Sequence, residues 1–362
     1  MEKLKLQLVA LFFFFILLFS GITVGGLNQK DNINLESDER FFYTGEKISD
    51  NFYFVHITDT HLLHRLFDRN ETSKKRLDSV LKYIISFDEK PTFVVITGDL
   101  VEWGSGISGS MNYRTLMKCF YEKDNQYYAD SNYSIPVYFT PGNHDYYFDW
   151  NLINYHRFVD RNHVLENDRY VVNYENLTLF FVDSGSHFIL RPKEWLDVFG
   201  SGLTNRDIRW LEDVLSSYSS RHKIILMHFP AINWRDENGE MNGVIVRNRE
   251  LFVELCEEYE VDLVLVGHTH SSVVIDSDEN VYDDLPLNCS QYPPLHVQTD
   301  DCKQGCHYRN ITVLGDDIWL DNCMEIQVAS VNLKSTDIWS NSLERFQLVN
   351  TKKLIHIRTS QQ

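Results

Sequence analysis

Residues 52–61 read Phe52-Tyr-Phe-Val-His-Ile-Thr-Asp59-Thr-His61, an apolar run that ends in two side chains able to bind a metal ion. The run is short, rich in aromatic and β-branched residues and free of Gly and Pro, which is typical of a buried β-strand. If the chain stays extended beyond the strand, Asp59 and His61 point to the same face, because side chains alternate along an extended segment. We therefore predict a strand that delivers a carboxylate and an imidazole to one point at its end.

The same arrangement follows four other predicted strands. Apolar runs at 93–97, 137–140, 223–227 and 261–266 precede, in order, Gly98-Asp99, Pro141-Gly-Asn143-His144-Asp145, His228 and Gly267-His268-Thr-His270. Functional side chains collect at the strand ends of α/β sheets, because that edge borders a crevice and the strands fix the geometry. These ends therefore predict one shared set of metal-ligating donors: Asp59, His61, Asp99, Asn143, His228, His268 and His270.

The donor types indicate which cofactor the site takes. Asp, Asn and His without thiolates suit divalent ions such as Mn²⁺, Fe²⁺ or Zn²⁺ in a reactive site rather than a Cys-rich structural zinc site. Seven donors with one shared carboxylate make two four-ligand sets, so we expect two divalent metal ions. Two ions roughly 3.5–4 Å apart lower the pKa of a bridging water and hold a phosphoryl oxygen. This pattern predicts metal-assisted hydrolysis of a phosphoester.

The five blocks, D-x-H, G-D, G-N-H-D, a later H and G-H-x-H, resemble the pattern of the calcineurin-like metallophosphoesterase superfamily over residues 59–270. The resemblance implies an α/β fold, a four-layer α-β-β-α double β-sandwich with a dinuclear metal site at the strand ends. It also implies two ligand sets, which are Asp59, His61, Asp99 and His270 for one ion and Asp99, Asn143, His228 and His268 for the other. By the same resemblance His144 would protonate the leaving group and Asp145 would orient it.

The expected activity is hydrolysis of small phosphodiesters by a metal-bridging hydroxide. The stretch around His56 is most similar to the cyclic-nucleotide phosphodiesterase-type branch of the superfamily. Glu102 stands where purple acid phosphatases have a metal-binding Tyr, which disfavours that branch. A phosphomonoesterase or nucleotidase on the same site is one alternative. A non-catalytic metal-binding scaffold protein is the alternative from another class, although the ligand set shows no degraded position.

Charge and the N-terminus indicate the compartment. The 362-residue chain has 34 Lys and Arg against 52 Asp and Glu, a net charge of −18, so its long-range field repels nucleic acid. Residues 1–26 combine Lys3 and Lys5 with a 12-residue apolar run, Leu8–Phe19, as a signal peptide does; an uncleaved membrane anchor is the alternative. Five glycosylation sequons agree with a secreted glycoprotein; they are Asn70, Asn132, Asn176, Asn288 and Asn310. We expect a secreted or extracytoplasmic protein.

The chain divides into four predicted parts. A signal peptide or anchor (1–26) and a polar linker (27–50) precede a metallophosphoesterase domain at 51–335. Within that domain we expect a Cys-containing insertion at about 276–309, and after it a C-terminal extension at 336–362. Short β-strands are expected at 310–314, 318–320 and 325–332. The Ser/Gly-rich stretch around Gly104, Gly106 and Gly109 has no following helix start and is expected to be a loop.

Six cysteines, an even number, suit disulfides outside the cytoplasm. Four of them lie within 35 residues; they are Cys289, Cys302, Cys306 and Cys323. We expect disulfides among these four. A zinc site is the rival interpretation, but no CxxC pair is present. Cys256 lies on an apolar helix stripe and is expected to be a buried free thiol. Five aromatic residues follow the metal-binding blocks and would either line a pocket for an organic group or pack in the core; they are Trp103, Tyr146, Tyr147, Phe229 and Trp234.

Overall fold

A computed structural model of the chain describes residues 42–44, 48–120, 134–147, 149, 151–159, 169–185, 202–241, 243–292, 294–326 and 345–348. The expected signal peptide or anchor and Asn132 lie outside the described residues. Among the described helices, none combines the length and apolar character needed to cross a membrane.

Two seven-stranded sheets form the centre of the molecule, and both are mixed. One has the order β1-β5-β6-β7-β8-β11-β9, with bounds Phe42–Thr44, Tyr170–Asn173, Leu177–Phe181, His222–Leu226, Leu263–Val266, Leu295–Gln298 and Val273–Asp276. The other has the order β10-β13-β12-β2-β3-β4-β14, with bounds Leu287–Asn288, Asp317–Glu325, His307–Leu314, Asn51–Ile57, Val94–Thr97, Ser134–Thr140 and Arg345–Leu348. A 3₁₀ turn, η2, covers Cys289–Gln291.

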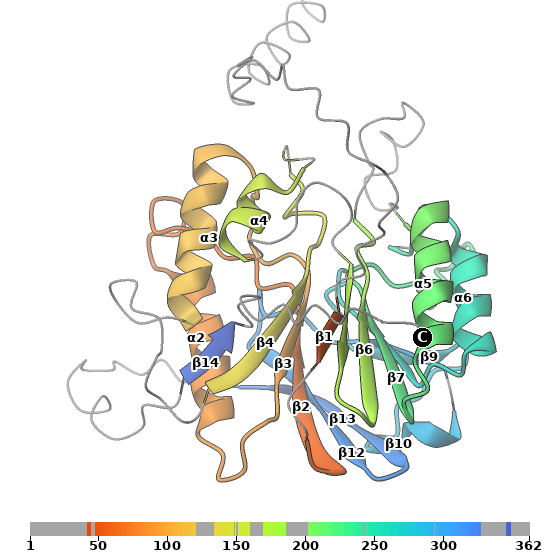
Figure 1. Cartoon of the computed structure of the whole chain (residues 1–362). Helices are drawn as coiled ribbons and strands as arrows, with labels where there is room; N and C mark the ends of the chain where they lie inside the picture. Colours follow the sequence, from red (N-terminus) through yellow and green to blue (C-terminus); the bar gives the residue numbers. More distant parts are fainter. Residues whose placement is uncertain are drawn as a thin grey trace, which may run out of the picture.

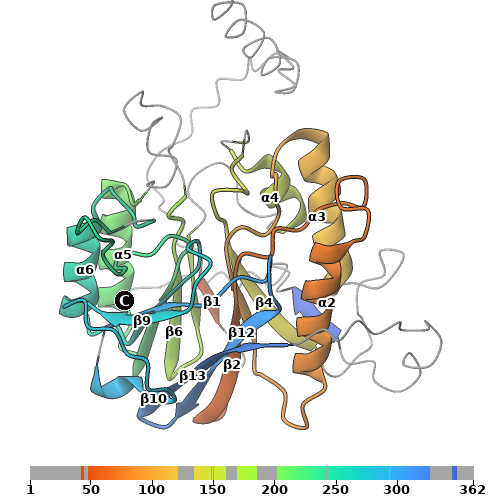
Figure 2. The same ribbon diagram turned by 180° about the vertical axis from the view of Figure 1, so that it is seen from behind.

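Helices cover the outer face of each sheet (Figures 1 and 2). Helices α2 (Thr72–Ile85), α3 (Gly106–Phe120) and α4 (Ile153–Phe158) lie beside the β2–β3–β4 sheet, and α5 (Asn205–Ser217) and α6 (Arg249–Glu258) lie beside the other. One apolar cluster fills the space between the sheets and two others lie under the helices. The expected four-layer double β-sandwich is confirmed.

The sequence pattern explains why these elements form. Strands β2, β3, β7 and β8 are parallel and buried on both faces, which is why they read as continuous apolar runs. In α5 the apolar residues at helical spacing are buried, and Thr204 caps the helix in a capping box with Asp207; the buried residues are Ile208, Leu211, Val214 and Leu215. Helix α2 follows the same spacing, and its Leu77, Val80, Leu81 and Ile84 are buried.

Four sequence predictions need correction. The stretch expected to be a loop contains the start of α3, whose weak helix formers at 106–110 are outweighed by burial of Tyr113, Leu116 and Phe120. The short strand expected at 318–320 is a nine-residue strand, β13. The expected insertion at 276–309 supplies β10, β11 and the start of β12, so it is built into both sheets. The expected linker and C-terminal extension supply edge strands β1 and β14.

All six cysteines are free thiols, so the disulfides that we expected are not formed in this structure. Cys302 and Cys306 are buried in the apolar cluster under α2, and Cys289 is buried between the sheets. These thiols therefore act as small apolar core residues. The prediction of a buried free thiol at Cys256 is confirmed.

Candidate metal centre

The loops that follow the parallel strands converge at one edge of the two sheets. The His61 amide donates to the Asp99 carbonyl (2.8 Å), and the His144 amide donates to Asp99 Oδ1 (2.8 Å). From the other sheet, the His268 amide donates to Asp59 Oδ2 (2.9 Å). These bonds join the sequence blocks into one site, as the pattern of strand ends predicted.

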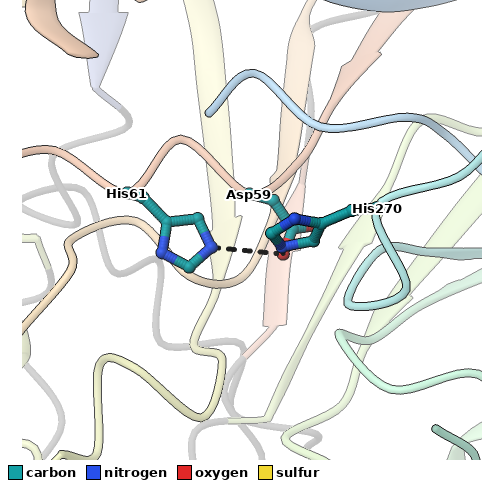
Figure 3. Close-up of side chains that lie close together, drawn as sticks. All are labelled: Asp59, His61 and His270. Atoms are coloured by element: carbon teal, nitrogen blue, oxygen red, sulfur yellow. Dashed lines mark ion pairs between the residues drawn. The ribbon is translucent and has the colours of Figure 1, made fainter. Parts of the chain in front are cut away.

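Asp59, His61 and His270 form the first ligand group (Figure 3). Asp59 Oδ1 lies 3.6 Å from His61 Nε2 and 3.3 Å from His270 Nε2. The ligand atoms of the three side chains all lie within 4.8 Å of one another. Asp59 and His61 are buried and His270 is partly exposed, so the group opens to solvent on the His270 side.

Asp99, His228 and His268 form the second ligand group. Asp99 Oδ1 lies 3.3 Å from His228 Nε2, and the His228 and His268 rings are 5.2 Å apart. Asn143 belongs to the same place, because its Oδ1 lies 3.1 Å from His228 Nε2. The structure thus brings together all seven side chains that the sequence predicted as ligands.

Asp99 connects the two groups. Its Oδ2 lies 3.4 Å from His61 Nε2 of the first group, and its Oδ1 contacts His228 of the second. The side chain is buried, so both carboxylate oxygens face the site rather than bulk water. This is the geometry required of a carboxylate that is shared between two ions.

Two observations test whether these residues fit metal ions. Asp59 Oδ1 and His61 Nε2 are buried atoms without a hydrogen-bond partner in the part of the chain that the structure describes. Buried polar atoms are rarely left without a hydrogen bond, and a cation between them would satisfy both. In addition, five of the seven candidate ligands have a positive φ, a backbone state that non-glycine residues adopt rarely; they are Asp59, His61, Asp99, His268 and His270. The residues fit a dinuclear centre.

The charges of the side chains agree with a cation site. Burial alone would lower the pKa of His61 and His228, but the neighbouring Asp59 and Asp99 carboxylates raise both pKa values to about 9. In the same way Asp301 and Asp59 outweigh burial and raise the pKa of His270 to about 10. Burial would raise the pKa of Asp59 and Asp99, but the adjacent histidines hold both pKa values well below the usual range. Without metal, protons balance the buried carboxylates, so a divalent cation binds in competition with protons.

Three ligand histidines have their outer nitrogen fixed, so that Nε2 points into the site. His61 Nδ1 donates to Glu102 (2.9 Å), and His228 Nδ1 donates to the Thr97 carbonyl (2.9 Å). His270 Nδ1 lies 3.2 Å from Asp301 Oδ2. Such partners fix the tautomer and ring orientation of metal-binding histidines.

His144 lies beside the ligand groups, with its Nε2 3.9 Å from Asp99 Oδ2. Its Nδ1 donates to the carbonyl oxygen of Glu102 (2.8 Å), and its side chain is one-fifth exposed. Burial lowers the pKa of His144, an effect that Asp99 partly offsets. The ring thus presents Nε2 to the site and has access to solvent, as a proton donor requires.

The role expected for Asp145 needs correction. Its carboxylate accepts hydrogen bonds from the amides of Leu100 (3.1 Å) and Gly142 (2.9 Å) and from Tyr113 Oη (2.7 Å). The contact that orients the His144 ring comes from the Glu102 carbonyl instead. Asp145 therefore holds the loops around His144 in place.

Sequence reasoning missed the roles of Glu102, Asp301 and Lys303. Glu102 Oε2 accepts from His61 and lies 3.0 Å from Lys303 Nζ. Asp301 and Lys303 follow β11, a strand that the sequence analysis did not predict. The same rule of polar residues after a strand would have found them if β11 had been recognised.

The structure divides the five aromatic candidates into packing residues and exposed residues. Phe229 is buried, with 1% of its surface exposed, and Tyr146 donates to the buried Asp183 carboxylate, so both are packing residues. Trp103, Tyr147 and Trp234 are exposed.

Comparison with known proteins shows the family. Residues 52–272, more than half of the chain, match the sequence model of the calcineurin-like phosphoesterase family, and the chain belongs to that family. It is a metallophosphoesterase, a hydrolase of a family that uses divalent metal ions.

The similar proteins are remote in sequence. Glycerophosphodiester phosphodiesterase GpdQ of Enterobacter lignolyticus is 24% identical over 251 residues, covering 68% of this chain and 80% of the relative. A probable glycerophosphodiester phosphodiesterase GpdQ of Arcobacter nitrofigilis is 24% identical over 220 residues, covering 60% and 71%. Among solved structures, GAP50, the anchor in the inner membrane complex of Plasmodium, aligns with a TM-score of 0.48 at 12% identity over 78% of this chain and 90% of that chain.

Proposed function

We propose that this protein is an exported phosphodiesterase that uses two divalent metal ions, with His144 as general acid. The observation that carries the proposal is the position of Asp99, whose two oxygens contact both ligand groups. One set comprises Asp59, His61, Asp99 and His270, and the other comprises Asp99, Asn143, His228 and His268. A buried carboxylate shared in this way is the arrangement that two-metal hydrolytic sites require.

When bound, the two ions would supply a water of low pKa and positive charge for the phosphoryl oxygens. In hydrolysis, the oxygen of a water molecule would bond to phosphorus as the bond from phosphorus to the leaving oxygen breaks. His144 Nε2 gives its proton to the departing alkoxide and is reprotonated by the proton that the water loses. The Glu102 carbonyl keeps His144 Nδ1 protonated and the ring oriented during this exchange.

Small phosphodiesters are the substrate class that we infer. Both matched relatives are named as glycerophosphodiester phosphodiesterases. A positioned acid such as His144 is most useful for a basic alkoxide, the leaving group of an ordinary alkyl diester.

A comparison at constant leaving group tests the substrate class. Metal-loaded protein is given 4-nitrophenyl phosphate and methyl 4-nitrophenyl phosphate, and kcat/KM is measured for each. We expect a preference for the diester of at least about tenfold, or about 1.4 kcal/mol. A preference for the monoester would support the phosphomonoesterase or nucleotidase alternative. No turnover of either substrate with both ions bound would support a non-catalytic scaffold.

Export rests on the N-terminal segment, residues 1–26, and on the sequons, of which Asn70 is exposed. Expression of the full chain in a glycosylating eukaryotic cell, followed by mass spectrometry, tests it. We expect secreted protein that lacks the N-terminal segment and has a glycan at Asn70, and that glycan is absent from Asn70→Gln. Full-length chain in the membrane fraction would support the anchor, and full-length unglycosylated chain in the cytoplasm would contradict export.

A further inference from the structure

Each of the first three loops at the metal centre presents one exposed aromatic ring. Phe67 lies in the loop after β2, Trp103 in the loop after β3 and Tyr147 in the loop after β4. Their exposed fractions are 44%, 37% and 38%. We call these three residues the aromatic rim. Exposed aromatic rings that gather beside a site usually mark a binding surface.

A ring contact and hydrogen bonds between loops hold the rim. The Phe67 and Trp103 rings are 5.4 Å apart in an edge-to-face arrangement. Buried Asn112 of α3 joins their loops, because its Oδ1 accepts from the His64 amide (2.8 Å) and its Nδ2 donates to the Trp103 carbonyl (3.2 Å). The loop of Tyr147 joins them where the Gly104 amide donates to the His144 carbonyl (3.1 Å).

A glycine is required at that junction. A Cβ atom on Gly104 would lie 1.8 Å from the carbonyl oxygen of Asp145. The loops after β3 and β4 can approach this closely only without a side chain at Gly104. The backbones that carry Trp103 and Tyr147 are therefore held close together.

The rim contacts His144 through Tyr147, and Trp103 is the sequence neighbour of a residue that binds His144. The Tyr147 and His144 rings are 4.9 Å apart. Trp103 directly follows Glu102, whose carbonyl oxygen accepts from His144 Nδ1. Because the general acid must lie next to the departing oxygen, the organic group bonded to that oxygen would lie close to Tyr147. A leaving group with an apolar body would cover these rings and gain by excluding water from them.

We propose that the aromatic rim is the subsite for the leaving alcohol, and that this subsite selects phosphodiesters whose leaving alcohol has an apolar or aromatic body. The inference rests on the proposed phosphodiesterase function and adds the substrate class. The shared chemistry is an apolar group on the departing oxygen, which either a flat aromatic ring or a lipid-like alkyl chain supplies.

An unsymmetrical diester provides an internal test. Methyl 2-phenylethyl phosphate can release either methanol or 2-phenylethanol, two alkoxides of similar basicity, so chemistry alone gives a ratio near one. We expect metal-loaded protein to release 2-phenylethanol over methanol by at least about 10:1. Methyl octyl phosphate forms the second arm: a higher ratio there assigns the rim to alkyl chains, and a lower ratio assigns it to aromatic rings.

Variants locate the effect in the rim. Phe67→Ala and Trp103→Ala should each move the ratio towards one, and Phe67→Ala alone suffices if Trp103→Ala does not fold. Tyr292→Ala is the matched control, because Tyr292 is 39% exposed and lies near the start of β11, at the opposite end of the parallel strands. Its ratio should equal that of the unmodified protein.

The ratio of the two released alcohols, together with total turnover, tests the rim subsite separately from the proposed phosphodiesterase function. Normal diester turnover with a ratio near one in both arms overturns the rim subsite and leaves the phosphodiesterase in place. Absence of turnover on every diester overturns the proposed function, and the subsite with it. A ratio near one combined with vesicle binding to phosphatidylcholine that Phe67→Ala abolishes would assign the rim to a membrane surface and overturn the inference.

Discussion

Asp301 lies outside the five sequence blocks, yet its carboxylate contacts a candidate metal ligand. Its Oδ2 is 3.2 Å from His270 Nδ1, while His270 Nε2 faces Asp59. Asp301 is buried, so the contact is shielded from water. A carboxylate in this position fixes the ring and increases the basicity of the nitrogen that faces the metal.

We expect Asp301→Asn to lower Mn²⁺ affinity by about 10–100-fold, because the amide cannot match the charge of the carboxylate. Calorimetric titration of chelator-treated protein measures this directly. Asp300→Asn is the matched control, because Asp300 is the adjacent carboxylate and contacts His307 rather than His270. Equal affinities for Asp301→Asn and the unmodified protein would show that Asp301 has no part in metal binding.

A variant of His144 tests whether this residue donates a proton or binds a metal ion. We expect His144→Ala to keep both ions but to lose about 10²–10⁴-fold in kcat on diesters with alkoxide leaving groups. The loss should shrink sharply for 4-nitrophenyl esters, whose leaving group needs little protonation. Elemental analysis and kcat on the two substrate types are the measurements. A loss of one ion, or equal losses on both substrate types, would exclude His144 as the general acid.

At the residue scale, the sequence predicted the seven candidate ligands and His144 but not what surrounds them. The ligands were visible because each follows a recognisable strand. Asp301 was not visible because β11 is four residues long and lies in a stretch that we interpreted as an insertion. The contact between Glu102 and His61 depends on how two loops pack, which no local pattern encodes.

At the element scale, the ends of the strands can meet only because a glycine precedes Asp99. Gly98 has φ +79°, and a Cβ there would lie 2.4 Å from the His228 ring. The strand end from one sheet therefore contacts the histidine from the other without an intervening side chain. The backbone of this element sets the spacing between the two ligand groups.

Gly98→Ala should lower the affinity of the second metal ion by at least about tenfold, because the added methyl group displaces His228. Gly239→Ala is the matched control, since Gly239 has φ +81° and nothing within 4 Å of its Cβ position. In both variants an alanine must adopt a left-handed backbone conformation, which should lower the free energy of unfolding by about 1–2 kcal/mol. Denaturant unfolding measures this loss. Only Gly98→Ala should also lose metal, as measured by titration, and equal metal binding by both variants would contradict the account.

The sequence predicts an element well when the element is a helix buried on one face or a strand buried on both faces. Helices α2 and α5 bury the stripes that their spacing indicates, and the parallel strands read as apolar runs. Helix α3 was missed because its first turns contain Gly106, Ser108, Gly109 and Ser110. The helix forms there because packing of its later residues against the sheet outweighs local propensity.

On the scale of the whole molecule, each of the two sheets supplies part of the site. The β2–β3–β4 sheet supplies Asp59, His61, Asp99, Asn143 and His144, and the other sheet supplies His228, His268 and His270. The apolar cluster between the sheets fixes their separation. The chain has a net charge of −18, so bound metal ions would provide the local attraction for an anionic substrate.

The central claim is that hydrolysis requires two ions at one shared centre. Chelator-treated protein is titrated with Mn²⁺ while turnover of bis(4-nitrophenyl) phosphate and bound metal per chain are measured together. The account predicts no turnover without metal, a plateau at two bound ions, and loss of both ions in Asp99→Asn. A plateau at one ion, turnover by the metal-free protein, or two tightly bound ions in Asp99→Asn would contradict it.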